Sequence, residues 1–249
     1  HGLFSGGQFN GSSGYEEAAA QGLIAGINAA MELLGKEQII LDRSESYIGV
    51  LIDDLVTKEN HEPYRMMTSR AEYRLLLRQD NADLRLTKIG YRVGLISKER
   101  YDWVCEKERL IEEEIERVKC TRIGANEKVQ NLLQQFDSIP LHTGVSLADL
   151  IRSPELNYDC LAPIDSERPD LPAEVREQVN INIKYEGYIV RQKKQVEHFK
   201  KLEKKKIPDD IDYDEVNSLR LEARQKLKAL RPVRIAQASR ISAGSPADI

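Results

Sequence analysis

The sequence predicts a mainly helical chain with a small β component, an α+β protein. Apolar residues recur with helical spacing over long stretches of the second half, which is the signature of amphipathic helices. Charged residues make up 31% of the 249 residues and aromatic residues only 6%, a balance that favours a helical, water-soluble protein. A glycine-rich segment near the N-terminus runs into an alanine-rich stretch and adds one strand-to-helix unit.

The N-terminal segment carries the clearest local signals. Residues 2–7 read as a short strand ending in glycines, and residues 15–34 read as a helix. Ser13 and Glu16 have the spacing of a capping box, which predicts where the helix begins. A glycine-rich loop at a helix N-terminus offers backbone N–H groups to phosphate or flavin oxygens. The alternative is an ordinary tight turn from strand to helix.

The pattern of residues 41–94 leaves two choices open. Residues 46–55 fit either a strand or a short helix, and residues 73–78 fit either a buried strand or a helix. A turn is expected at residues 79–83, followed by a short helix at residues 88–94.

Helical periodicity takes over at Ser97. An amphipathic helix is expected over residues 97–120, with an acidic face toward solvent. A proline-punctuated linker at residues 160–172 leads into a second long helix over residues 172–206, which we expect to pack antiparallel against the first. Shorter helices are predicted at residues 126–136, 147–152, 215–229 and 233–241.

We expect four parts along the chain. They cover residues 1–40, 41–94, 95–206 and 207–249. In the last part, Val233 to Pro246 reads as a short helix, a glycine turn and a capped second helix, the pattern of a helix-turn-helix but also of many small bundles. The first helix has no sheet before it and the last one starts as the sequence stops, so we expect a chain cut at both ends.

Positive charge is concentrated in three segments, although the formal net charge is −4. Lys and Arg outnumber Asp and Glu by eight to five over residues 58–92, nine to three over 184–206 and seven to one over 220–240. Such patches favour binding of a polyanion at chosen places. In the first of them, arginines interleaved with tyrosines suit contacts to phosphates and bases. The alternative there is internal ion pairing.

Several kinds of protein and site find no support. No apolar stretch is long enough to span a bilayer and no signal-peptide pattern is present, so we expect a cytoplasmic protein without a membrane partner. Three widely spaced cysteines and four scattered histidines give neither metal-ligand spacing nor a catalytic arrangement. No metal site and no catalytic residue is therefore assigned.

Gly187 lies inside a predicted helix, where a glycine costs about 1 kcal/mol relative to alanine. Close approach of another chain is one reason to keep a glycine there, and internal packing is the commoner reason. Both readings predict that Gly187→Leu weakens folding or the packing of a partner.

Several motifs, in order along the chain, resemble the C-terminal part of the MnmG/GidA family of tRNA-modifying enzymes. They are GQFNGSSGYEEAAAQG at 7–22, EPYRM at 62–66, TSRAEYRL at 68–75, DNADLRL at 80–86, KYEGYI at 184–189 and QASRIS at 237–242. The likeness is weaker from Ser97 to Asp170. The resemblance makes residues 1–40 the end of an FAD-binding α/β domain, followed by a helical C-terminal domain.

The resemblance implies an enzyme that uses FAD and NADH to add a carboxymethylaminomethyl group to the wobble uridine of tRNA. It implies a GTPase partner of the MnmE family and a homodimer. The family's dinucleotide-binding glycines and candidate catalytic cysteines lie upstream of His1, so we expect this chain alone to be inactive and to hold FAD weakly.

The resemblance also assigns roles to residues of this chain. The residues expected at the cofactor are Gln8, Asn10, Gly11, Ser13, Gly14, Tyr15 and Glu16. Those expected to contact tRNA are Arg65, Arg70, Arg74, Arg85, Lys184 and Arg191. Those expected at the partner are Arg234, Gln237 and Arg240. The alternative functions are a freestanding helical nucleic-acid-binding module and a scaffolding protein.

Overall fold

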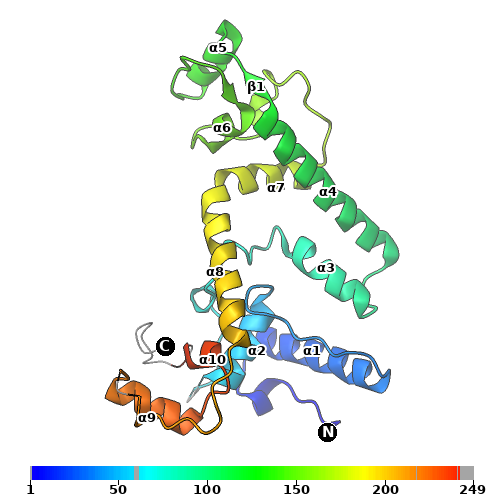
Figure 1. The fold of residues 1–249 in the computed structure, drawn as a ribbon. Coiled ribbons are helices and arrows are strands. Elements are labelled where there is room, and N and C mark those ends of the chain that lie inside the picture. The colour runs from blue at the N-terminus through cyan, green and yellow to red at the C-terminus, as the bar shows by residue number, and fades with distance from the viewer. Residues whose placement is uncertain (1, 59–61, 217, 240, 242–249) are drawn as a thin grey trace. The chain divides into compact units, whose positions relative to one another are not determined.

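The computed structural model describes residues 2–58, 62–216, 218–239 and 241. Within them the chain forms ten α-helices and two strands of two residues each, so the prediction of a mainly helical protein is confirmed (Figure 1). The chain divides into two compact units. One, here called unit 2, is the continuous stretch Arg78–Val190; the other, unit 1, combines His1–Leu77 with Arg191–Ile249.

Unit 2 is built on the long helix α4 (Lys98–Cys120). The Ser97 side chain accepts a hydrogen bond from the Arg100 N–H, which caps the helix as predicted. The other elements of this unit are α3 (Ala82–Arg92), β1 (Arg122–Ile123), α5 (Glu127–Gln135), β2 (Val145–Ser146), α6 (Leu147–Arg152), the 3-10 helix Asp159–Leu161 and α7 (Ala173–Lys184). Strands β1 and β2 pair antiparallel, Arg122 opposite Ser146.

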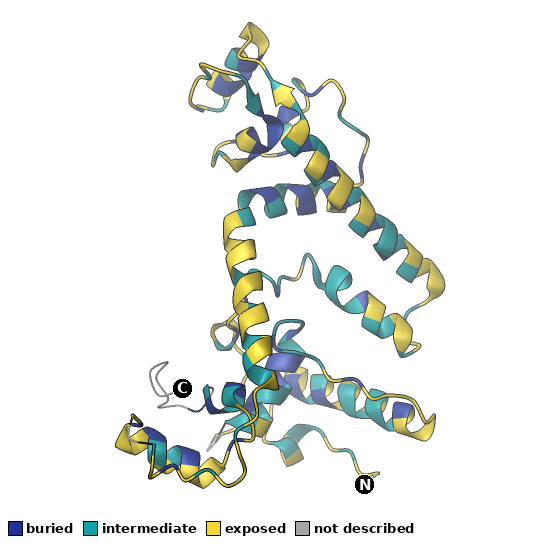
Figure 2. Ribbon diagram, viewed as in Figure 1, coloured by how far each residue is buried: buried dark blue, intermediate teal, exposed yellow. Residues whose placement is uncertain are grey.

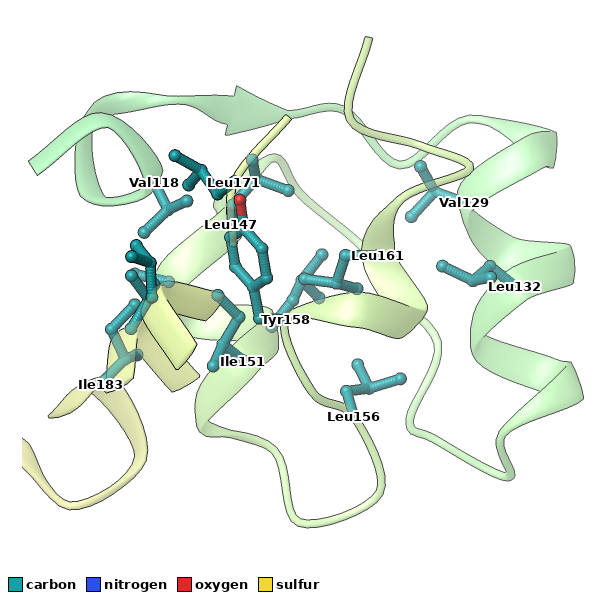
Figure 3. Packing of buried hydrophobic residues seen from close by; sticks show 14 of the residues in the cluster. Val118, Val129, Leu132, Leu147, Ile151, Leu156, Tyr158, Leu161, Leu171 and Ile183 are labelled. Atoms are coloured by element: carbon teal, nitrogen blue, oxygen red, sulfur yellow. The ribbon is translucent and has the colours of Figure 1, made fainter. Parts of the chain in front are cut away.

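The core of unit 2 lies between α4, α5, α6 and α7. Val118, Leu147, Ile151 and Tyr158 pack together there, and the ring of Tyr158 lies in the middle of the apolar cluster (Figure 3). The Tyr158 hydroxyl donates a hydrogen bond of 2.6 Å to the buried carboxylate of Glu114. The polar atom that the ring carries into the core is thereby satisfied.

Helix α7 packs on α4, but the predicted antiparallel arrangement is wrong. Lys107 of α4 pairs with Glu174 at 3.1 Å, and Lys119 pairs with Glu186 at 2.6 Å. Both numbers rise together along the two segments, so the helices run in the same direction. The linker of residues 160–172 returns the chain to Lys107, in the first half of α4, where α7 begins. A sequence pattern does not reveal this return.

The single helix predicted over residues 172–206 is two helices. Helix α7 ends with Tyr185 as its C-cap, and α8 (Glu186–Lys204) begins directly after it. A Cβ added at Gly187 would meet nothing within 4 Å, and Gly187 is exposed. Internal packing therefore does not explain this glycine, and the expected loss of folding stability in Gly187→Leu loses its basis.

Unit 1 contains α1 (Tyr15–Leu33), α2 (Tyr47–Thr57), most of α8, α9 (Leu221–Leu230) and α10 (Ile235–Ser239). Two 3-10 helices, Gly7–Asn10 and Thr68–Arg70, complete it. Its C-terminal segment forms a small apolar cluster around Tyr213, Leu219 and Leu227. Figure 2 shows how much of α8 is exposed compared with α7.

Several predicted elements of unit 1 differ from the structure. Residues 2–6 form no strand. Residues 47–57 are helical, which resolves the open choice there, whereas residues 73–78 form turns rather than a strand or a helix. Helix α9 begins at Leu221 instead of residue 215. The second helix of the helix-turn-helix pattern lies outside the described residues.

Candidate functional site

The glycine-rich segment forms a tight loop fixed from behind by helix α1. Gly7 and Gly11 have φ angles of +76° and +72°, values that favour glycine. Gln21 of α1 holds the loop at two points: its Oε1 accepts from the Gly7 N–H at 2.7 Å, and its Nε2 donates to Ser12 Oγ at 2.8 Å. Gln21 and Ser12 are buried, so this is a fixed scaffold.

The side chains predicted at the cofactor divide into two groups on this loop. Asn10 closes the loop, because its side chain donates to the Ser5 carbonyl at 2.8 Å and accepts from the Ser5 hydroxyl at 2.8 Å. The other side chains are exposed on the outer surface of the loop and on the first turn of α1. They are Gln8, Ser13, Tyr15 and Glu16.

The start of α1 differs from the predicted capping box. The N-cap is Gly14 and no side chain caps it, so Ser13 does not play that role. A Cβ on Gly14 would overlap the buried Glu17 carboxylate, whose Cδ would lie 2.9 Å away, and this explains the glycine. Glu16 and Glu17 occupy the first turn and already supply negative charge to the positive end of the helix dipole. This arrangement disfavours a phosphate there and leaves room for an uncharged acceptor or donor.

Glu17 ties the helix start to the neighbouring segment. Its carboxylate is 4% exposed, and Oε1 accepts the Met66 N–H at 2.7 Å. This hydrogen bond lowers the pKa of Glu17 despite the opposing effect of burial. The second oxygen, Oε2, is buried without a hydrogen-bond partner in the structure. Arg65, largely exposed, approaches Oε1 at 3.5 Å.

Behind the loop lies a buried charge network that the sequence patterns did not reveal. The Tyr64 N–H donates to the Gly11 carbonyl at 2.7 Å, and its hydroxyl donates to Asp54 Oδ2 at 2.8 Å. Asp54 is fully buried and pairs with Arg43 at 2.6 Å and with Lys58 at 2.8 Å. One sequence feature could have revealed the network. Asp54 lies on the same helix face as the apolar Val50, and an acid on a buried face needs a buried partner.

Hydrogen bonds from Lys58, Arg43 and Tyr64 act against burial at Asp54. Burial alone would raise the pKa of this carboxyl, but the hydrogen bonds together outweigh it and the pKa is lowered. Burial and the hydrogen bond to Asp54 raise the pKa of the Tyr64 hydroxyl. The network is therefore ionised at Asp54 and neutral at Tyr64 near neutral pH.

The arginines predicted to contact tRNA also divide into two groups. Arg85 donates to Asn81 Oδ1 and to the Arg78 carbonyl, both at 2.9 Å, and Lys184 donates to the Ser153 and Pro154 carbonyls. These two side chains serve internal contacts. Arg78 also makes an internal contact, an ion pair with Asp80 at 3.0 Å. Internal pairing, one of the two interpretations of the arginine-rich segment, therefore describes these residues.

Arg65, Arg74 and Arg191 face outward, whereas Arg70 is half-buried and its buried Nε has no hydrogen-bond partner among the described residues. Arg70 lies over the Tyr64 ring at 4.4 Å from its centroid. Arg74 and Arg191 are exposed. Arg191 also lines a groove that is bounded by α8 on one side and by Glu72 and Tyr73 on the other. Arg65 approaches Glu17 at 3.5 Å and has no closer acidic partner among the residues that the structure describes.

The predicted partner residues lie at the C-terminal end of unit 1. Gln237 accepts the Val233 N–H at 3.0 Å and so closes the turn before α10. Arg234 is exposed, and its backbone bridges to Lys206. Arg240 lies outside the described residues.

Other kinds of site are not evident in the parts of the chain that the structure describes. Among these residues no helix combines the length and apolarity needed to cross a membrane, and no group of three or more His, Cys, Asp or Glu side chains could hold a metal ion. The three cysteines are free thiols.

Family models match most of the chain. The C-terminal helical domain of the tRNA modifying enzyme MnmG/GidA matches residues 98–193, and the C-terminal helical bundle of the same enzyme matches residues 195–249. The model of glucose inhibited division protein A matches residues 1–37, which hold the glycine loop and α1.

Curated relatives and solved structures resemble the chain over its whole length. The tRNA uridine 5-carboxymethylaminomethyl modification enzymes MnmG of Lachnoclostridium phytofermentans and Caldicellulosiruptor saccharolyticus are 66% and 63% identical to it, each over 100% of this chain. The structure of Aquifex aeolicus GidA in the form II crystal is 47% identical with a TM-score of 0.78, covering 100% of this chain and 39% of that one. The chain spans about 40% of the length of these curated relatives. Three matching domains in sequence order, together with this likeness, show that the chain belongs to the MnmG/GidA family.

Proposed function

We propose that the chain forms part of a flavin-dependent enzyme that adds a carboxymethylaminomethyl group to the wobble uridine of tRNA. The relatives' printed name supports the tRNA uridine chemistry. The single structural observation that carries the proposal is the glycine loop, which Gln21 and Tyr64 fix from behind while Gln8 and Ser13 stay exposed in front.

The loop fits the uncharged ring of a flavin better than its phosphates. The first turn of α1 already carries two carboxylates, which would repel a phosphate. The Gln8 amide, the Ser13 hydroxyl and the exposed Gly11 backbone can donate to or accept from the ring's carbonyl and N–H groups. FAD, when bound, supplies the redox chemistry. Asn10 acts indirectly, by keeping the loop closed.

The tRNA would meet the outward-facing arginines. Arg65 and Arg74 are exposed, and the half-buried Arg70 holds its guanidinium over the Tyr64 ring. Arg85 and Lys184 would shape unit 2 through their internal hydrogen bonds rather than contact RNA. We propose further that NADH reduces the flavin, that the enzyme is a cytoplasmic homodimer, and that an MnmE-family GTPase docks on the segment of Arg234, Gln237 and Arg240.

Gln8→Leu tests the flavin part of this function. The variant removes an exposed amide at the loop, so the protein expressed from its complete coding sequence should retain less flavin and form less modified uridine in tRNA. Flavin content is read from absorbance and the nucleoside from mass spectrometry. The matched control is Gln134→Leu, an exposed glutamine on α5. Equal flavin content in both variants would contradict the assignment of the loop.

The same preparation separates this function from the alternatives. A nucleic-acid-binding module would bind tRNA but leave its uridines unmodified, with or without NADH. A scaffolding protein would show no tRNA binding that weakens as salt rises.

A further inference from the structure

A groove on unit 1 lies along one side of α8. Its volume is about 620 Å³, and it opens to solvent. Arg191, Lys194 and His198 line it from α8, while Glu72 and Tyr73 line it from the segment that follows the Thr68–Arg70 turn. Phe199 adds an aromatic edge. Cations beside aromatic side chains are the combination that binds RNA backbones and bases.

Arg191 and Lys194 form no ion pair with any residue that the structure describes. Arg191 and Lys194 are exposed, and within the described stretches of the chain neither has an acidic partner within 4.0 Å. An exposed cation without a partner keeps its charge available for a ligand. Arg85 and Lys184, by contrast, donate hydrogen bonds to backbone carbonyls within the protein.

The one acid among the residues that line the groove is paired with a buried cation. The Glu72 carboxylate accepts three hydrogen bonds from the Arg43 guanidinium, one on Oε1 at 2.8 Å and two on Oε2 at 3.0 and 3.2 Å. This pairing offsets part of the negative charge of Glu72, because Arg43 also pairs with Asp53 and Asp54. The cations that line the groove come from α8.

The spacing along α8 extends this row. Residues 191, 194 and 198 are separated by three and four positions, which puts them on one helix face, and Lys201 continues it seven positions after Lys194. From Arg191 to Lys201 the helix rises about 15 Å. That length faces several consecutive phosphates of one nucleic-acid strand, because each strand carries a charge about every 3.4 Å along the axis.

We propose that this groove binds the phosphodiester backbone of the tRNA substrate through Arg191, Lys194 and Lys201. The proposal rests on the function proposed above and adds the place where one strand of the RNA lies. Sequence reasoning found only Arg191 of these three, because the partners on α8 become recognisable only once the groove is seen.

The test is a pair of double variants in the protein expressed from its complete coding sequence. Arg191→Gln with Lys194→Gln removes two charges from the groove. Lys193→Gln with Lys200→Gln removes two charges from the opposite side of the same helix, at 100° per residue, where both lysines are exposed and Lys200 makes a long pair of 3.9 Å with Asp42. The two variants have the same net charge, so any difference between them reflects position.

Binding of an unmodified tRNA transcript is measured over a range of salt concentrations. For the groove variant we expect a Kd about tenfold higher and a salt slope smaller by about 1 to 2. The opposite-side variant should stay within about twofold of wild type. Thermal unfolding confirms that both remain folded, as expected for exposed positions.

The outcomes separate the two proposals. If wild type binds tRNA and the groove variant binds it equally well with the same salt slope, the groove is refuted while the tRNA function stands. If both double variants weaken binding equally, only net charge matters and the groove is again refuted. If wild type shows no salt-dependent binding, the groove and the tRNA function fail together.

Discussion

Gly49 in α2 sits where the helix touches the backbone that precedes it. A Cβ at this position would lie 2.7 Å from the Leu41 carbonyl oxygen, a contact with main chain that cannot rotate away. We expect Gly49→Ala to lower the free energy of unfolding by about 2 kcal/mol, as overpacking does. Urea denaturation measures the change.

The control is Gly26→Ala on α1, where an added Cβ meets nothing within 4 Å. Removing a glycine from an exposed helical position should raise the free energy of unfolding by up to about 1 kcal/mol. Shifts of the same sign in both variants would mean that the close approach at Gly49 is unimportant.

The buried carboxylate of Asp54 makes stability depend on pH. Its pKa is lowered in the folded state, because the hydrogen bonds from Lys58, Arg43 and Tyr64 outweigh burial. The unfolded chain therefore binds the proton more readily, so this contribution is complete above the ordinary aspartate pKa of about 3.9 and is lost as pH falls below it. Glu17, whose pKa is also lowered, acts in the same direction.

Asp54→Asn tests this linkage. The substitution leaves Arg43 buried with only its partly exposed partners, so we expect a loss of roughly 3 kcal/mol at pH 7. The variant should also lose less additional stability than wild type between pH 7 and pH 3. Guanidinium denaturation gives the free energy of unfolding of both proteins at each pH. If it falls equally in the two proteins between pH 7 and pH 3, Asp54 is not a source of the pH dependence.

At the level of elements, Lys107 joins three helices of unit 2. It is 3% exposed on α4 and pairs with Asp83 of α3 at 2.9 Å and with Glu174 of α7 at 3.1 Å. We expect Lys107→Met to lower the free energy of unfolding by about 2 kcal/mol, because it leaves the largely buried Asp83 carboxylate without its closest cation. Lys98→Met removes an exposed pair with Asp102 on the same helix and should cost under about 0.5 kcal/mol. Chemical denaturation of both variants gives the comparison.

Elements whose ends are marked by side chains could be predicted from the sequence, and elements set by tertiary contacts could not. Ser97 and Asn126 accept hydrogen bonds at the starts of α4 and α5, where the pattern placed them. The break at Tyr185 has no proline or buried glycine to signal it. The parallel course of α7 along α4 depends on a long linker and on charge pairs between residues far apart in sequence.

The candidate site shows the same division. The glycine loop could be predicted because its residue types are unusual. The roles of the individual residues within it could not be predicted. Asn10 has the chemistry of a ligand-binding amide and is used for loop closure, a choice made by the position of Ser5. Gln21, Glu17 and Asp54 belong to helices and look like ordinary polar positions until their burial is known.

At the level of the whole molecule, unit 2 has the properties of an independent folding unit. It is one continuous stretch, residues 78–190, with its own apolar core around Leu147, Ile151 and Val175. We expect this stretch, expressed alone, to unfold in a single cooperative transition on heating. Ile151→Ala should destabilise it by about 2 to 5 kcal/mol. A dispersed amide spectrum checks the native state, and a non-cooperative melt would contradict the prediction.

The division of unit 1 into two segments has a consequence for how the protein is made. Residues 1–77 share their unit with residues 191–249, and Asp42 meets Lys200 across this gap in the sequence. A ribosome adding roughly 5 to 20 residues per second needs several seconds to tens of seconds to make the stretch between them. During that interval the glycine loop and α1 exist without their later neighbours, while unit 2 can already fold. Unit 1 can therefore be completed only after the whole of unit 2 has been synthesised, so the surface that residues 1–77 later bury against residues 191–249 stays without that partner in the meantime.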